Sequence, residues 1–453
     1  MTMIRRSAFP SGKASRAAVI AGALLLIIVV AFLLFTDPLV NWLVRPRIIS
    51  AFNEAYPAYA LHIGGMRYSI ADNRVDFASV AIDAVDSAYG GTVDALSLSG
   101  LHWTRLLWGG HLGPDDFADV TLDIDQIETT LPGAQYECRC ERLHASVRDS
   151  VIVADSLLLR PLTGDEEFFR GSLFRETRFR LVAPHVSVKG LACIGMCEAK
   201  YYHARSLECR DVLLDVLINK DKASKVDSSP PAMPAELLTS LQTPVQVERL
   251  VVVNGRLNYG ERFAVEGKVA CITLDSLELQ VTGIDNQAGP GAPVAVRAKA
   301  KFMKAGTMLV EMSIPLGLPT FSLEYSGALS AMNLSALNTF LETAEQIRIK
   351  TGVLHSATFA IHVEAGRASG TVRAVYRDLS LAAINKRTGS ESGFADNITS
   401  FIANTFKLHQ TNVPDKSGKL KIGQVKYMRA RDDPFFRFEW FALRSGVKDV
   451  AGF

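Results

Sequence analysis

Residues Met66–Phe77, MRYSIADNRVDF, hold the pattern that decides the fold. Met66, Tyr68 and Ile70 place an apolar side chain at every second position up to Asp72-Asn73. The alternation then returns with Val75 and Phe77. Alternation on both sides of a short polar turn predicts a β-hairpin in which one face of each strand is apolar.

The same alternation recurs along most of the chain, with Gly, Asp, Asn or Pro between the runs. Further runs are Val120, Leu122 and Ile124; Val186 and Val188; Val245 and Val247, then, after a phase slip, Leu250 and Val252; Leu274, Leu277 and Leu279; and Phe359, Ile361 and Val363. Repeated short runs of this kind predict a mainly β protein of antiparallel strands.

A few short amphipathic helices interrupt the strands. We expect helices over Ala235–Gln242, over Leu334–Gln346 behind an Asn333 cap, and over Ala395–Leu408. A last helix should start at Asp432-Asp433-Pro434 and end near Val450. Its apolar seam is predicted to contain Phe436, Trp440, Leu443, Val447 and Val450. This helix would either plug the end of the sheet or touch lipid headgroups or a protein partner.

The predicted strands each have one apolar face, and the predicted helices are too few to bury these faces. The apolar face of the sheet must therefore be covered in another way. Two closed β-sandwich domains would satisfy this requirement without any ligand. An open, curled sheet whose trough holds an apolar ligand would satisfy it equally well. Periodicity alone does not separate these two architectures.

The run Ala17–Phe35, AAVIAGALLLIIVVAFLLF, contains no charged or strongly polar side chain. Its 19 residues would reach about 28 Å as a helix, close to the hydrocarbon thickness of a bilayer. The run exceeds the apolar region of about 7–15 residues in a signal peptide, which favours an uncleaved anchor. The anchoring side chains we single out are Ala17, Leu24, Leu25, Leu26, Ile27, Ile28, Val29, Phe32 and Phe35.

Basic residues before this run predict its orientation. Arg5, Arg6, Lys13 and Arg16 precede it without an acidic residue, so the N-terminus should stay in the cytoplasm. In a bacterium, the protein would then be a single-pass protein of the inner membrane with the bulk of the chain in the periplasm.

The charge composition argues against nucleic acid as a partner, and the state of the cysteines is left undecided. The 49 Lys and Arg nearly balance the 47 Asp and Glu, so no global positive field favours nucleic acid. The six cysteines are compatible with cross-strand disulfides or buried thiols. Metal ligation by the pairs Cys138/Cys140 and Cys193/Cys197 is the less favoured alternative, because neither has Cys-x2-Cys spacing.

Motifs of enzymes are not found in the sequence. It has no Gly-x-Ser-x-Gly elbow, no His-Glu-x-x-His motif and no phosphate-binding loop, and its nine His residues are scattered. We therefore expect neither an enzyme nor a bound cofactor.

The C-terminal third resembles the AsmA-like family of bacterial envelope proteins. The strings that carry the resemblance are FSLEYSGALSAMNLSALNTFL (321–341), IRIKTGVL (347–354), GRASGTVRAVYRDL (366–379), SFIANTFKL (400–408) and RDDPFFRFEWFALRSGVKDV (431–450). Weaker support comes from PAELLTSLQTPVQVERLVVVNGRLNY (234–259). The segment that contains Cys138–Cys209 departs most from the family pattern.

The resemblance implies an elongated, curled antiparallel β-groove, related to TamB and the bridge-like lipid-transfer proteins. It further implies a role in phospholipid transport or outer-membrane biogenesis, without catalytic residues. The expected groove-lining side chains are Met66, Tyr68, Ile70, Phe321, Leu323, Phe359, Ile361 and Val363. Expected partners are phospholipid or another acyl-chain lipid, the inner membrane, and an envelope protein at the C-terminal end.

The predicted organisation follows the chain from the anchor outward. Its parts are a cytoplasmic N-terminus (1–16), a transmembrane anchor (17–35), an N-terminal β-groove region (36–218), an exposed linker (219–234), a second AsmA-like β region (235–390) and a C-terminal helix-strand-helix tail (391–453). The alternative to the groove is a membrane-tethered scaffold of closed β-sandwich domains that recruits envelope partners.

Overall fold

The computed structural model describes residues 40–452, except 70, 87–88, 101–116, 194, 196–199, 224–229, 385–390 and 393–407. It confirms a mainly β protein. The predicted span Ala17–Phe35, Ile70 and almost all of the helix predicted over Ala395–Leu408 lie outside the described residues. Among the helices that are described, none combines the length and the apolar character needed to cross a bilayer.

The chain forms two compact units, residues 1–125 and 126–453. Their boundary falls within strand β4 (Thr121–Leu131). Each unit is described by itself below.

The first unit contains the predicted hairpin. Its described elements are η1 (Val40–Val44), α2 (Arg45–Ala55), β1 (Tyr59–Ser69), β2 (Arg74–Ala84) and β3 (Gly90–Ser99). Met66 pairs with Phe77 and Tyr68 with Val75 in antiparallel register, which confirms the hairpin. Strand β3 then pairs with β2. Asn73 adopts φ 46° in the turn, a backbone conformation that Asn tolerates better than most residues.

The second unit contains the remaining elements. Its strands are β5 (Tyr136–Ser146), β6 (Val151–Pro161), β7 (Thr177–Lys189), β8 (Tyr202–Arg210), β9 (Leu213–Asn219), β10 (Val245–Arg262), β11 (Val269–Asp285), β12 (Pro293–Phe302), β13 (Gly306–Pro315), β14 (Leu323–Asn333), β15 (Ile347–Glu364), β16 (Arg367–Ile384), β17 (Glu391–Ser392) and β18 (Gly423–Met428). Its helices are η3 (Pro132–Ala134), α4 (Asp165–Arg170), α6 (Pro234–Thr239), η4 (Leu334–Leu337), α7 (Asn338–Ala344) and α8 (Phe435–Ala451).

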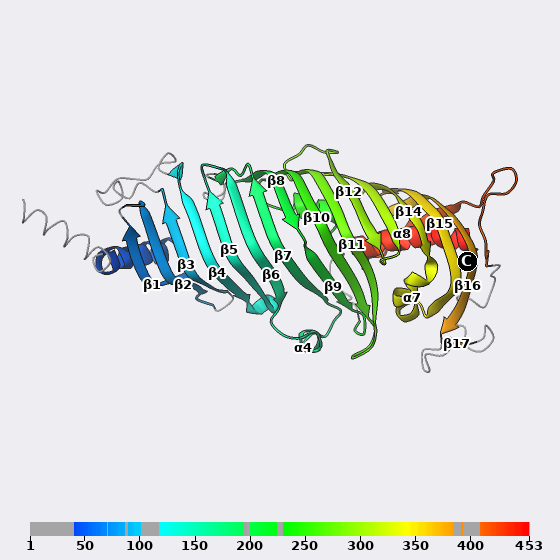
Figure 1. The fold of residues 1–453 in the computed structure, drawn as a ribbon, viewed down its shortest axis with the longest axis horizontal. Coiled ribbons are helices and arrows are strands. Elements are labelled where there is room, and N and C mark those ends of the chain that lie inside the picture. Colours follow the sequence, from blue (N-terminus) through cyan, green and yellow to red (C-terminus); the bar gives the residue numbers. More distant parts are fainter. Residues whose placement is uncertain are drawn as a thin grey trace, which may run out of the picture. The chain divides into compact units, whose positions relative to one another are not determined.

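Neighbouring strands of this unit pair in antiparallel register, with one exception (Figure 1). Strands β8 and β9 form one interrupted strand, because both pair with β7 on one side and with β10 on the other. Their pairing with β10 is parallel. A parallel pair needs a crossover connection, and residues 220–244 with α6 supply it.

The segment predicted as an exposed linker is anchored at both ends. Asn219 closes β9, and both Asn219 and Met233 are fully buried. Met233 belongs to the main hydrophobic core, and Leu238 of α6 packs against that core. Of the apolar residues predicted for this helix, Leu237 and Leu241 are exposed.

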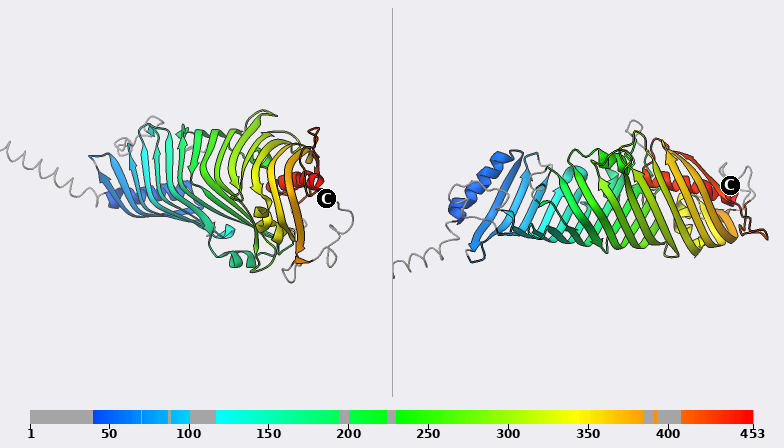
Figure 2. Two further views of the ribbon diagram at one scale, coloured as in Figure 1. Left: turned by 45° about the vertical axis from the view of Figure 1, so that its right-hand side comes forward. Right: turned by 90° about the horizontal axis from the view of Figure 1, so that it is seen from above.

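Residues with positive φ interrupt several strands of the second unit, whose curvature is visible in Figure 2. Ser156, Asp211, Asn254 and Ser276 all adopt positive φ values between 49° and 57°. The Asn254 side chain donates from Nδ2 to Asp211 Oδ1 at 2.6 Å, which links two of these positions. The register of β10 with β11 shifts around Gly255, and that of β11 with β12 shifts between Asp275 and Glu278, which marks β-bulges at Asn254 and Ser276. A bulge bends its strand and increases the local twist.

Helix α8 begins directly after Pro434 and ends at Ala451, as the sequence predicted. It packs on β16 and β18 and closes a core that includes Leu323, Ile361 and Val363. Asp433, which is fully buried, accepts hydrogen bonds from the Tyr427 hydroxyl (2.7 Å) and the Ala430 amide (2.9 Å) before the helix.

The seam that meets the sheet differs from the predicted one. Phe438, Ala442 and Gly446 are buried against the strands, whereas Phe436 and Val447 are 64% and 44% exposed. Val450 is buried, and Leu443 is packed against the core. The contact seam is rotated by about 100° around the helix axis from the predicted seam. The small residues Ala442 and Gly446 allow the helix to approach the sheet closely, and a pattern of apolar residues does not reveal such a contact.

Gly446 sets this close approach. A Cβ atom at Gly446 would lie 2.6 Å from Val372 Cγ2 and 2.8 Å from Val425 Cγ2. We expect Gly446→Leu to lower the free energy of unfolding by about 1–3 kcal/mol, because it overpacks this contact. Val447→Leu places the same leucine side chain at the exposed neighbour and should change the free energy of unfolding by less than about 0.5 kcal/mol. Urea unfolding measures both; equal effects would contradict the packing described.

Candidate functional site

Apolar side chains of the second unit align into rows that cross the strands. Row 1 contains Ala145, Ile152, Val188, Leu207, Leu250, Val281, Val296, Met312, Tyr325 and Ile361. Row 2 contains Leu143, Ala154, Val186, Cys209, Val252, Leu279, Ala298, Val310, Gly327 and Phe359. Row 3 contains Cys138, Leu159, Leu181, Leu214, Leu257, Leu274 and Phe302.

Each residue in a row is the direct register partner of the next, so their side chains share one face of the sheet. Met312, Tyr325 and Ile361 of row 1 belong to the core beneath α8 or pack against it, as do Phe359 of row 2 and Phe302 of row 3. The rows therefore lie on the face that carries α8, which we call the apolar face.

The opposite face is polar along the same strands. Gln280, Arg297, Glu311 and Ser326 are successive register partners there. Arg297 Nε lies 3.4 Å from Glu311 Oε1, and both side chains are at least 70% exposed. An exposed pair of this kind adds little stability, so this face is an ordinary solvated surface.

Helix α8 covers one end of the apolar face. Five of the residues predicted to line a groove lie here: Phe321, Leu323, Phe359, Ile361 and Val363. Leu323, Ile361 and Val363 are at most 3% exposed, and the Phe321 ring lies 5.8 Å from that of Phe438 on α8. In this structure Phe321, Leu323, Ile361 and Val363 are packed core beneath a helix, and Phe359 is half-buried against that core.

The other predicted groove residues belong to the first unit. Met66 is buried, and Tyr68 is half-buried. Their register partners Phe77 and Val75 pair in turn with Leu96 and Leu98 of β3, so apolar rows exist in this unit too.

The apolar face continues beyond the cover that α8 provides. From β5 to β10 the row residues are half-buried, except Ala154, which is small and buried. Together with Leu274 and Leu279 of β11, they belong to neither of the two buried hydrophobic clusters found among the described residues. We call these residues, with Leu274 and Leu279, the open part of the apolar face. It extends about 24 Å across the strands at the usual strand spacing of about 4.8 Å.

Two cysteines contribute to the open part. Cys138 lies in row 3 and Cys209 in row 2, and both are free thiols, as are Cys140 and Cys271. Burial raises the pKa of the Cys138 and Cys209 thiols, so they stay protonated and act as small apolar groups. No group of three or more metal-ligating side chains occurs among the described residues.

A buried ion pair lies on the apolar face toward the C-terminal end of β10. Lys220 Nζ lies 2.5 Å from Glu261 Oε1, and the Tyr259 hydroxyl donates to the same oxygen at 2.7 Å. Burial lowers the pKa of Lys220, and the Glu261 charge opposes this shift. Sequence reasoning missed this pair because Lys220 falls in the predicted linker and is 41 positions from its partner.

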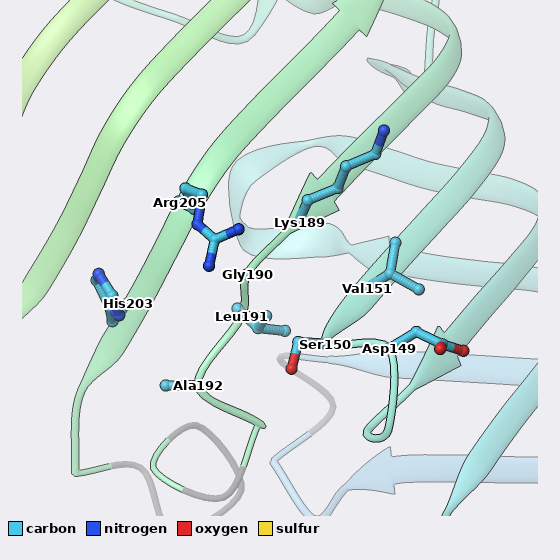
Figure 3. Close-up of a pocket in the computed structure, with 9 residues that line it drawn as sticks. All are labelled: Asp149, Ser150, Val151, Lys189, Gly190, Leu191, Ala192, His203 and Arg205. Atoms are coloured by element: carbon cyan, nitrogen blue, oxygen red, sulfur yellow. The ribbon is translucent and has the colours of Figure 1, made fainter.

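The hollow shown in Figure 3 has a volume of about 720 Å³ and lies at the ends of β6, β7 and β8. Lys189 and Arg205 line it without a carboxylate partner among the described residues. Lys189 pairs with Ser206, the neighbour of Arg205, so the two cations start on opposite faces of the sheet. Figure 3 shows the Lys189 side chain extending away from Arg205. The two charges do not converge on one ligand position.

No protein-family model matches the chain, and no curated protein matches it. The functional argument therefore depends on the apolar face.

The covered and open parts of row 1 should respond differently to a charge. Ile361→Asp places a carboxylate under α8 and should lower the free energy of unfolding by more than about 3 kcal/mol. Leu250→Asp places it on the open part, where water reaches it, and should cost less than half as much. Urea denaturation monitored by circular dichroism compares the two; equally large losses would show that the face is closed along its whole length.

Glu439 of α8 should make stability depend on pH. Its Oε1 atom is buried without a hydrogen-bond partner in the described part of the protein, and burial raises its pKa to about 8. Between about pH 4.3 and about pH 8, the unfolded chain loses this proton while the folded chain keeps it. The free energy of unfolding should therefore fall as pH rises through this window. Glu439→Gln should flatten the dependence, and an unchanged slope would contradict this assignment.

Proposed function

We propose that the open part of the apolar face binds the acyl chains of membrane lipid, and that the protein takes part in phospholipid transport or envelope homeostasis at the inner membrane. The observation that carries the proposal is the continuity of the three rows. They run without a polar interruption from beneath α8 to strands whose row residues belong to neither described hydrophobic cluster.

Acyl chains suit this surface because they require contact area and no directed polar partners. Each methylene removed from water contributes about 0.8 kcal/mol, whichever aliphatic side chain it touches. Since the rows cross the strands, a chain lying along the open part meets an apolar side chain, mostly Leu, Val or Ile, at every strand. Such a surface selects weakly among lipids and allows a chain to shift along it.

The sequence supports the proposed location. The apolar run Ala17–Phe35 would hold the protein in the membrane from which lipid is taken. The resemblance to the AsmA-like family points in the same direction. Under this proposal the protein acts by holding lipid, without a catalytic step.

The alternative is a membrane-tethered scaffold with closed domains. The filled core beneath α8 favours it for the C-terminal end of the second unit. It predicts that the open part of the apolar face is occupied by a protein partner and carries no lipid.

Mass spectrometry of lipid that copurifies with the full-length protein tests the proposal. We expect phospholipid in the wild type and at least a five-fold loss of it in Val252→Glu, which places a charge in row 2. Val251→Glu is the matched control, because Val251 is the neighbouring residue on the opposite face. It should keep the wild-type lipid content.

Circular dichroism confirms that both variants are folded before they are compared. Lipid-free wild-type protein would contradict the proposal and favour the scaffold. Equal lipid loss in both variants would place the lipid elsewhere.

A further inference from the structure

The polar side chains of η1 and α2 are directed at the free edge of strand β1. Asn41 donates from Nδ2 to the Met66 carbonyl at 2.6 Å and accepts from the Met66 amide at 2.8 Å. Arg45 donates to the Gly64 carbonyl at 2.8 Å, and Asn53 accepts from the Leu61 amide at 3.1 Å. The segment thus satisfies backbone groups that an edge strand would otherwise expose.

This arrangement leaves two large apolar side chains on the outer side of the segment. Trp42 is 77% exposed and Leu43 is 43% exposed. Tryptophan is highly buried on average in soluble proteins, so this degree of exposure is unusual. Both residues are oriented by the neighbouring Asn41 and Arg45, which hold the backbone against β1.

The outer side changes character along the segment. Its start carries Trp42 and Leu43, whereas the exposed residues further on are Pro46, Arg47, Ser50, Ala51, Asn53 and Glu54, which include no large apolar side chain. A helix with this gradient would place only its first turn in an apolar environment. The polar remainder would stay in water.

Chain continuity identifies that environment. Trp42 follows Phe35, the last residue of the 19-residue apolar run, by seven positions. Tryptophan is enriched where a spanning segment meets the headgroup layer, and Arg47 is placed to meet lipid phosphates.

We propose that Val40–Val44 and the start of α2 form a docking surface for the lipid bilayer, with Trp42 and Leu43 inserted at headgroup depth. The same segment then fixes the edge of β1 at the membrane surface. The inference does not depend on whether the apolar face of the second unit carries lipid.

Fluorescence of a single tryptophan tests this surface in the full-length chain. Trp103→Phe, Trp108→Phe and Trp440→Phe leave Trp42 as the sole reporter. The protein is reconstituted into phosphatidylcholine–phosphatidylglycerol vesicles that contain lipids brominated at defined acyl positions. We expect bromine close to the headgroups to quench Trp42 most strongly and aqueous acrylamide to quench it weakly.

The matched control moves the reporter within the same unit. Val85 is 73% exposed after β2, so Val85→Trp combined with Trp42→Phe gives an exposed tryptophan that the proposal does not place in lipid. It should be quenched by acrylamide and not by brominated lipid. Quenching of Trp42 by acrylamide alone would overturn the proposal. So would protection of Trp42 from both quenchers, because a protein surface would then cover it.

Discussion

A sheet that is apolar on only one face has to cover that face, and the second unit does so along only part of its length. Helix α8 lies on the last strands, where Gly446 and Ala442 bring it close to Val372 and Val425. The same rows of side chains continue to β5, where they are half-buried or small and belong to neither described hydrophobic cluster. Burial of apolar area is the main force that stabilises folded proteins. Binding of an apolar ligand or partner to the open part would therefore be favourable.

Two backbone features shape this face. In β10 and β11 the bulges at Asn254 and Ser276 lie between row 2 and row 3, so that Val252 and Leu257, and likewise Leu279 and Leu274, face the same side. The crossover of residues 220–244 then lets β10 continue the sheet in parallel with β8 and β9. The first residue of this crossover, Lys220, lies beside Glu261 and forms a buried ion pair with it. Removing one partner of such a pair leaves an uncompensated buried charge, so this border is sensitive to mutation.

Alternation in the sequence was enough to predict the β class and the Met66–Phe77 hairpin, because a turn with Asp72-Asn73 separates two clear runs. It was not enough at β10. The sequence suggested a phase slip between Val247 and Leu250, but pairing with β8 is regular there and the two residues face opposite sides. The irregularity lies at Asn254, which has a positive φ. Nothing in the sequence distinguishes this Asn from a polar residue with ordinary strand geometry. The contact seam of α8 was predicted wrongly for a related reason. Ala442 and Gly446 allow a close helix–sheet contact but add little apolar area, so an apolar pattern does not select them.

Photocrosslinking maps the occupant of the apolar face most directly. The full-length protein in vesicles would be irradiated with a phospholipid that carries a diazirine in its acyl chain, and the adducts located by mass spectrometry. The account predicts adducts on row residues of the open part, such as Leu207 and Val252, and none on their opposite-face neighbours Glu208 and Val251. Adducts on both faces alike, or a complete lack of adducts on the rows, would contradict it.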